Sequence, residues 1–166
     1  VKVFAPGSSS GGGLAAALPG GSVTATLGEN LFELDADMDA RTQVKEVVVK
    51  SWDPDKAEVP EEKSAEPSFS TNGDMPGTDL ADALGGESYY VQHSGALPTT
   101  EMKGIADARL LKSRLGRMRG RMKIQGTAAV KPGDSIALAG VGPRFEGSVV
   151  ATGIRHEIAR GNWLTD

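Results

Sequence analysis

The sequence predicts a mainly β fold, a small antiparallel β-barrel of about seven strands with one α-helix. Glycine and proline are frequent, at 22 and 9 of 166 residues, as in turn-rich β proteins. Most apolar segments alternate between apolar and polar residues, and only one has the 3.6-residue period of a helix. The length, with 39% hydrophobic and 24% charged residues, fits a single soluble domain that spans residues 1–166.

The N-terminal half is expected to supply strands and two loops. A Gly/Ser stretch at residues 7–13 predicts a flexible loop. Residues 22–27 and 31–38 are β-like runs, and the Gly and Asn between them favour a turn, so we predict a hairpin. The alternating run at residues 43–52 predicts another strand. Residues 53–84 contain four prolines, many acids and few large apolar side chains, which predicts a long acidic surface loop.

One helix and the remaining strands are expected after residue 84. A short strand is predicted at residues 88–92, and Thr99 is the expected N-cap of a helix that Gly116 ends. The period then changes to two, which predicts a strand at residues 116–125. Further strands are predicted at residues 135–141 and 147–159. The buried stripe of the helix should consist of Ile105, Ala108, Leu111 and Leu115.

The predicted strand at residues 116–125 carries four cations on one face, namely Arg117, Arg119, Arg121 and Lys123. Residues 103–123 hold eight Lys or Arg and one acid, a local charge of +7 in a chain whose formal net charge is -4. A groove for single-stranded nucleic acid would use such cations for phosphates but also needs aromatic side chains for bases. Glycine, methionine and isoleucine alternate with the cations instead.

The cationic face therefore favours three simpler interpretations: a solvated strand face, a subunit interface or a pore lining. Each interpretation requires the cations to meet water or acids, because an uncompensated buried charge costs several kcal/mol. In an assembly we expect the four cations to line the lumen or to meet an acidic surface of a neighbouring subunit. Candidate acids for such a contact are Glu58, Glu61 and Glu62.

Patterns for catalysis and metal binding are weak. The chain has no Cys, and His93 and His156 cannot by themselves build a zinc centre. Four acids have the spacing of a calcium loop, but Ala40 stands where the sharp turn needs glycine, so we expect no calcium site. These acids are Asp35, Asp37, Asp39 and Glu46. Arg160 replaces the second histidine of a zinc-protease motif. We expect no enzyme activity, no metal and no cofactor.

The two tryptophans and one of the histidines are expected to have structural roles. We predict that Trp52 and Trp163 pack or form interfaces, because each ends a β-like run, and that His156 is a hydrogen-bonded residue on a strand. No apolar run reaches the roughly 18 residues needed to span a bilayer, and the N-terminus lacks a signal-peptide pattern. The sequence therefore predicts no membrane anchor.

Three segments carry motifs of one known family: residues 32–56, 106–126 and 130–166. The motifs are Trp-Asp-Pro, a helix that leads into a basic strand, Lys-Pro-Gly-Asp, Arg-Phe-x-Gly, and Arg-His-Glu before Asn-Trp-Leu-Thr. In these motifs the chain resembles the Vgr spike proteins and phage late-control D proteins, the baseplate hub and spike of contractile injection systems. The acidic segment at residues 53–84 and the Gly/Ser stretch depart from the resemblance.

The resemblance implies a structural protein without catalytic activity. Members of the family form trimers in which two related barrels per subunit make a pseudo-sixfold ring, and this ring adapts the sixfold tube to the trimeric spike. The chain would then hold one hub barrel of a longer protein. That protein would form a homotrimer and contact tube and baseplate proteins. It would be assembled in the bacterial cytoplasm and become part of a secreted or injected particle, as in type VI secretion or a phage-tail-like particle. The alternative is a small β-barrel that binds nucleic acid through residues 117–123.

Overall fold

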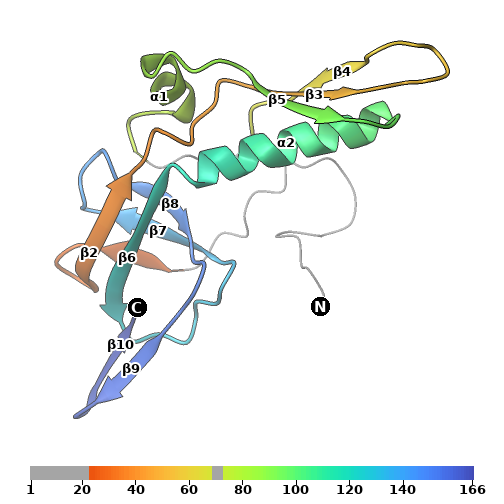
Figure 1. Cartoon of the computed structure of the whole chain (residues 1–166). Helices are drawn as coiled ribbons and strands as arrows, with labels where there is room; N and C mark the ends of the chain where they lie inside the picture. Colours follow the sequence, from red (N-terminus) through yellow and green to blue (C-terminus); the bar gives the residue numbers. More distant parts are fainter. Residues whose placement is uncertain (1–22, 69–72) are drawn as a thin grey trace. The chain divides into compact units, whose positions relative to one another are not determined.

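The computed structural model describes residues 23–68 and 73–166, and it confirms a mainly β fold (Figure 1). The predicted features at residues 7–13 lie outside these ranges. Within these ranges the structure has ten strands and two helices, more than the roughly seven strands and one helix predicted. The strands are β1 (Thr24–Thr26), β2 (Leu31–Met38), β3 (Val47–Ser51), β4 (Glu61–Lys63), β5 (Tyr89–His93), β6 (Met118–Gln125), β7 (Ser135–Ala139), β8 (Gly147–Val150), β9 (His156–Ala159) and β10 (Asn162–Thr165), and the helices are α1 (Gly77–Ala83) and α2 (Thr99–Leu115).

The chain divides into two compact units. Of the residues that the structure describes, unit 1 holds residues 23–37, 68, 73–75 and 119–166, and unit 2 holds residues 38–67 and 76–118. Among the residues that the structure describes, no helix is long and apolar enough to cross a membrane.

Unit 1 is built on two sheets. In the first sheet β7 lies between β1, which runs parallel to it, and β8, which runs antiparallel. In the second sheet the order is β2-β6-β10-β9, and β9 and β10 form a hairpin. Apolar side chains at alternate positions of these strands are buried, including Ile136 and Leu138 of β7 and Ile124 of β6.

The predicted hairpin of residues 22–27 and 31–38 is wrong in its pairing. β1 pairs with β7, more than 100 residues later, and β2 lies beside β6. Between them Gly28 has a φ of 84°, and the Asn30 side chain accepts a hydrogen bond from the Thr26 N–H at 2.7 Å. The turn therefore carries the chain from one sheet to another. A period of two identifies a strand but does not identify its partner.

The strands of residues 23–68 and 73–166 form three separate sheets, and these strand orders do not close a barrel. The predicted antiparallel arrangement also holds only in part, since β1 pairs with β7, and β3 with β5, in parallel. Parallel pairing needs a long connection between the two strands, and the sequence does not show which distant segments such a connection brings together.

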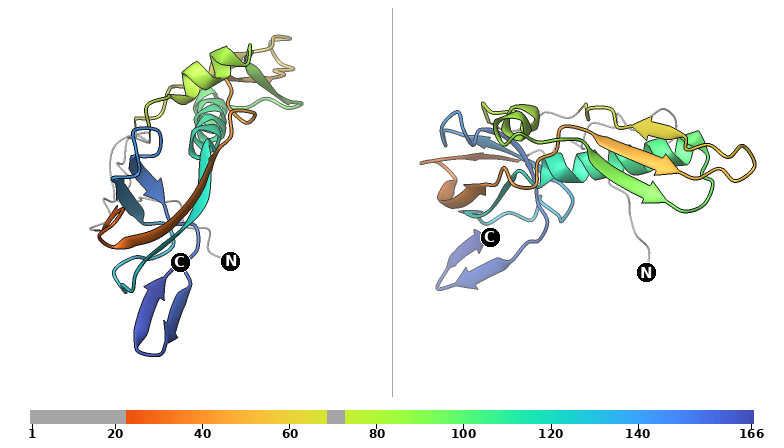
Figure 2. Two further views of the ribbon diagram at one scale, coloured as in Figure 1. Left: turned by 90° about the vertical axis from the view of Figure 1, so that its left-hand side faces the viewer. Right: turned by 45° about the horizontal axis from the view of Figure 1, so that its top comes forward.

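Unit 2 is a three-stranded sheet, ordered β4-β3-β5, with α2 along one face (Figures 1 and 2). Val47 and Val49 point from β3 to the helix because they are two residues apart on a strand. Met102, Ala106 and Leu110 meet them from α2 at four-residue spacing, and all five are almost fully buried. This cluster is the core of the unit.

None of the four residues of the predicted buried stripe of α2 is fully buried, although Ile105 packs against the core. The buried residues are Met102, Ala106, Leu110 and Arg114, whereas Ala108 and Leu115 are exposed. The buried stripe includes an arginine, so a pattern that counts only apolar residues cannot identify the stripe. The helix starts after Pro98, without a side-chain cap from Thr99, and it ends at Gly116 as predicted.

The prediction that residues 53–84 form a loop without secondary structure is wrong in two places. β4 pairs with β3 through backbone groups, which does not require apolar side chains. Helix α1 begins after Pro76, whose extended conformation suits a helix start, and it buries Leu80 and Ala81. The average composition of residues 53–84 does not indicate either element.

Ser51→Ala is expected to raise the free energy of unfolding by about 1 kcal/mol. The Ser51 side chain is only 1% exposed, and its Oγ has no hydrogen-bond partner among the described residues. An unpaired buried hydroxyl opposes folding, and alanine removes it with little loss of volume. The matched control is Ser88→Ala, which removes a 2.7 Å hydrogen bond to Glu46 and should lower stability. Urea unfolding of both variants tests this, and a less stable Ser51→Ala protein would show that the hydroxyl is satisfied.

Candidate functional site

Three of the four cationic residues, Arg119, Arg121 and Lys123, lie on strand β6, in the part of that strand that belongs to unit 1. Successive side chains of a strand point to opposite faces, so Arg119, Arg121 and Lys123 share one face. Arg119 and Arg121 are exposed, whereas Ile124, on the other face, is only 3% exposed. The predicted separation of a cationic face from an apolar face is therefore confirmed for these residues.

The neighbouring strand β2 carries acids with the same spacing, namely Glu33, Asp35 and Asp37. Lys123 Nζ lies 2.6 Å from Glu33 Oε2, which shows that the two charged rows lie on the same face of the sheet. Glu33 raises the pKa of Lys123 by accepting its hydrogen bond and through its charge. We call the three acids and three cations the charge-paired face; its residues are Glu33, Asp35, Asp37, Arg119, Arg121 and Lys123.

Gly120 allows β2 and β6 to lie close together. A Cβ atom added at Gly120 would overlap the carbonyl oxygen of Asp35 and would lie 2.8 Å from the Cα of Ala36. Both of these are backbone atoms, which cannot move aside as a flexible side chain can. A glycine at this position is therefore needed to hold the acidic and basic rows side by side.

Arg117 differs from the other three cations, and its predicted place on the solvated face is wrong. It precedes β6, belongs to unit 2 and is only 3% exposed. Burial lowers the pKa of Arg117, and the nearby positive charge of Arg114 lowers it further. Arg117 therefore belongs to the packing of unit 2, and only three cations remain on the charge-paired face.

Arg114 is the most tightly held cation in unit 2. Its Nε and Nη2 donate to the two carboxylate oxygens of Glu66 at 2.7 and 3.0 Å, and Nη1 donates to the Val44 carbonyl at 2.9 Å. The arginine side chain is only 1% exposed, while that of Glu66 is 50% exposed. This two-pronged contact ties the end of α2 to two loops of the same unit.

The acids expected to meet the cationic face have other places. Glu61 binds Lys50 on the neighbouring strand at 2.6 Å, and it raises the pKa of that lysine. Glu58 and Glu62 lie with it in the β3–β4 hairpin region of unit 2. The partner that the structure gives Lys123 is Glu33, in the same unit of the same chain. Sequence reasoning missed it because the alternation along β6 does not show that β2 is the neighbouring strand.

The four calcium-like acids do not form one loop. Asp35 and Asp37 lie on β2, Asp39 holds Arg41 at 2.9 Å, and Glu46 accepts hydrogen bonds from Ser88 and Lys63. The bond from Ser88, followed by that from Lys63, lowers the pKa of Glu46. Within residues 23–68 and 73–166, no group of three or more Asp, Glu, His or Cys is arranged to hold a metal ion.

His156 and Trp163 are structural, as predicted. On β9 the Nδ1 atom of His156 lies 3.1 Å from Thr165 Oγ1 and accepts a 3.4 Å hydrogen bond from Trp163 Nε1. The two rings meet edge to face, with their centroids 5.8 Å apart. The indole also lies directly over Gly126, where an added Cβ would overlap the ring. Trp52, in unit 2, is 43% exposed.

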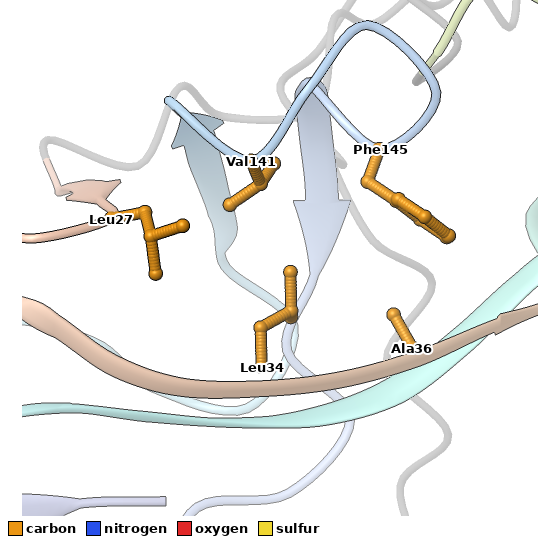
Figure 3. A pocket seen from close by; sticks show the side chains of 5 residues that line it. All are labelled: Leu27, Leu34, Ala36, Val141 and Phe145. Carbon is orange, nitrogen blue, oxygen red and sulfur yellow. The ribbon is translucent and has the colours of Figure 1, made fainter.

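Unit 1 also has an apolar pocket that the sequence did not reveal (Figure 3). It has a volume of about 290 Å³, and its lining side chains come from β2 and from the segments that follow β1 and β7. The lining residues are Leu27, Leu34, Ala36, Val141 and Phe145. Leu34 and Ala36 fall on the opposite face of β2 from its acids, so β2 contributes to both surfaces.

Two solved structures share the fold. The prophage MuSo2 43 kDa tail protein of Shewanella oneidensis has a TM-score of 0.59 and 9% identity, with coverage of 88% of this chain and 43% of that one. The tail protein of Neisseria meningitidis MC58 has a TM-score of 0.51 and 14% identity, with coverage of 87% and 42%. This chain thus spans less than half of each. A phage-tail-like fold, the coarser part of the sequence resemblance, is confirmed.

The sequence comparisons give one family. No curated protein matches the chain. Residues 17–160 match the model of the Alg8 N-terminal domain, which covers most of the sequence and both units. The chain therefore belongs to the Alg8 N-terminal domain family.

Proposed function

We propose that the chain is a structural hub component of a contractile injection machine, of the kind found in type VI secretion or phage-tail-like particles. In this role it adapts the sixfold tube to the trimeric spike, as part of a longer homotrimer that meets tube and baseplate proteins. The observation that carries the proposal is the fold shared with two phage tail proteins over 88% and 87% of the chain. Because one fold can serve several functions, the choice of the hub role rests on the Vgr-like and late-control D-like motifs.

The charge-paired face supports a role in packing against other proteins. Three acids and three cations stand on two neighbouring strands, with Lys123 paired to Glu33, so the formal charges of the face sum to zero. Such a surface can be covered by a subunit without leaving one sign of charge unpaired. The role requires no catalysis and no cofactor, and the particle would be assembled in the cytoplasm before it is secreted or injected.

The double variant Arg119→Ser/Arg121→Ser is expected to stay folded and to weaken assembly of the full-length protein with its tube and baseplate partners. Both side chains are exposed, so the free energy of unfolding should change by no more than about 1 kcal/mol. Arg109→Ser/Lys112→Ser is the matched control, since it removes two exposed cations from α2. Particle yield by electron microscopy is the measurement. Parent-like yields from the Arg119/Arg121 variant would reject an assembly role for this face.

Binding of DNA should be weak and should depend little on salt. Three phosphate contacts would give a log–log salt slope of about -2.7, at about -0.9 per contact. Glu33, Asp35 and Asp37 lie beside the cations and repel phosphate, so we expect a flatter response. Fluorescence titration of a duplex and a single strand between low and high salt measures the slope. A slope near the three-contact value would favour the nucleic-acid interpretation over the hub.

A further inference from the structure

Unit 1 presents an apolar projection as well as an apolar pocket. The hairpin of β9 and β10 extends from its sheet (Figure 1), and Ile158 near its tip is 74% exposed. One exposed aliphatic side chain is ordinary on a protein surface. Here, however, Ile158 is paired across the hairpin with Trp163, whose ring lies over Gly126 and against His156. The contacts of the Trp163 ring therefore hold the hairpin in place next to Ile158.

Two acids lie close in sequence to residues that line the pocket. Glu29 lies two residues from the lining residue Leu27, and Glu146 follows Phe145. Arg144 is also close in sequence, but its Nε binds Asp74 Oδ1 at 3.0 Å, which compensates its charge. Glu146 accepts a hydrogen bond from the Gly140 N–H, and a Cβ added at Gly140 would lie 3.7 Å from the backbone nitrogen of Leu27, so this carboxylate lies near the pocket.

The hairpin tip has the opposite charge. Arg160 forms the turn, with a φ of 51°, together with Gly161, whose φ is 80°. This places an exposed cation two residues from Ile158, on a backbone held by hairpin pairing. A knob made of one aliphatic side chain beside a cation is therefore complementary to an apolar pocket with acids close to its lining residues.

We infer that the pocket of one copy of this chain receives Ile158 from the hairpin tip of a second copy, with Arg160 facing Glu29 and Glu146. The knob and the pocket are different surfaces of the same unit, so the contact is head to tail. Repeating it closes a ring or extends a filament, depending on the rotation between copies. The inference rests on the proposed structural role in a ring-shaped assembly, but it concerns surfaces other than the charge-paired face.

Site-directed disulfide formation tests the contact, because the natural sequence contains no cysteine that could interfere. One preparation carries Ile158→Cys and the other carries Ala36→Cys or Leu34→Cys in the pocket. After mixing and mild oxidation, we expect a bridged dimer. In the matched control, the second preparation carries Lys131→Cys in place of the pocket cysteine. Lys131 is exposed and lies before β7, whereas the pocket residue Val141 lies after that strand.

Sedimentation equilibrium provides the second measurement. Ile158→Asp should weaken self-association at least about tenfold, as expected for the loss of one buried aliphatic side chain. Val59→Asp, at a residue of unit 2 that is 51% exposed, should leave it unchanged. Bridging no greater than with Lys131→Cys, or parent-like association of Ile158→Asp, would overturn the contact. A bridge from Ala36→Cys to a co-expressed tube protein would assign the pocket to a different partner. Neither result depends on the Arg119/Arg121 experiment, which decides the proposed role.

Discussion

Arg114→Ala is expected to lower the free energy of unfolding by about 3 to 5 kcal/mol, the largest effect of any substitution considered for unit 2. The change removes the bidentate contact to Glu66 and the bond to the Val44 carbonyl. It also empties the space of a side chain that is only 1% exposed, at the end of the buried stripe of α2. Urea unfolding, followed by far-UV circular dichroism, measures the change.

Two further variants separate the causes of this effect. Arg109→Ala removes an exposed arginine of the same helix and should change stability by less than about 0.5 kcal/mol. Arg114→Met keeps most of the side-chain volume without the charge, so it should recover much of the loss if the loss comes from packing. If Arg114→Ala behaves like Arg109→Ala, the buried contact does not hold unit 2 together.

Gly126→Ala is expected to destabilise unit 1 by about 1 to 3 kcal/mol and to displace the Trp163 ring. An added methyl group would overlap Cγ of the indole, which lies near the backbone and cannot swing away as the end of a flexible side chain can. Trp163 is one of two tryptophans, so a Trp52→Phe background makes its fluorescence report on this site alone. We expect the emission maximum to shift to longer wavelength as the ring enters water.

The control for this experiment is Gly104→Ala. Gly104 lies inside α2, and an added Cβ meets no atom within 4 Å there. Alanine favours the helix by up to about 1 kcal/mol, so this variant should be more stable than the parent. An unchanged emission spectrum and parent-like stability of Gly126→Ala would show that Trp163 does not pack on the glycine.

The sequence predicted local features better than partners. The mainly β class, the end of α2 at Gly116 and the alternation along β6 follow from periods of two and 3.6 residues, which are local properties. The pairing of β1 with β7 and of β3 with β5 depends on segments far apart in the chain. No local pattern encodes such a pairing, which explains why a hairpin and a small antiparallel barrel were predicted.

The candidate site shows the same limit. Alternation correctly placed Arg119, Arg121 and Lys123 on one face, but it could not show that Glu33 lies beside Lys123. Arg117 fits the same alternation and is nevertheless buried, because the strand begins only at Met118. The pocket was not predicted because its lining comes from three separate segments, each of which is an ordinary apolar stretch.

The discontinuous course of unit 1 has a consequence for the order of folding during synthesis. Its first segment ends at residue 37 and its last begins at residue 119, whereas all of unit 2 lies between them. Strand β1 must wait for β7, which is complete only at Ala139, and this delay lasts several seconds at about 5 to 20 residues per second. Unit 2 has its whole sheet and helix by residue 115. The nascent chain should therefore form its middle first, while the exposed edge of β1 remains open to chaperones until the last quarter of the sequence emerges from the ribosome.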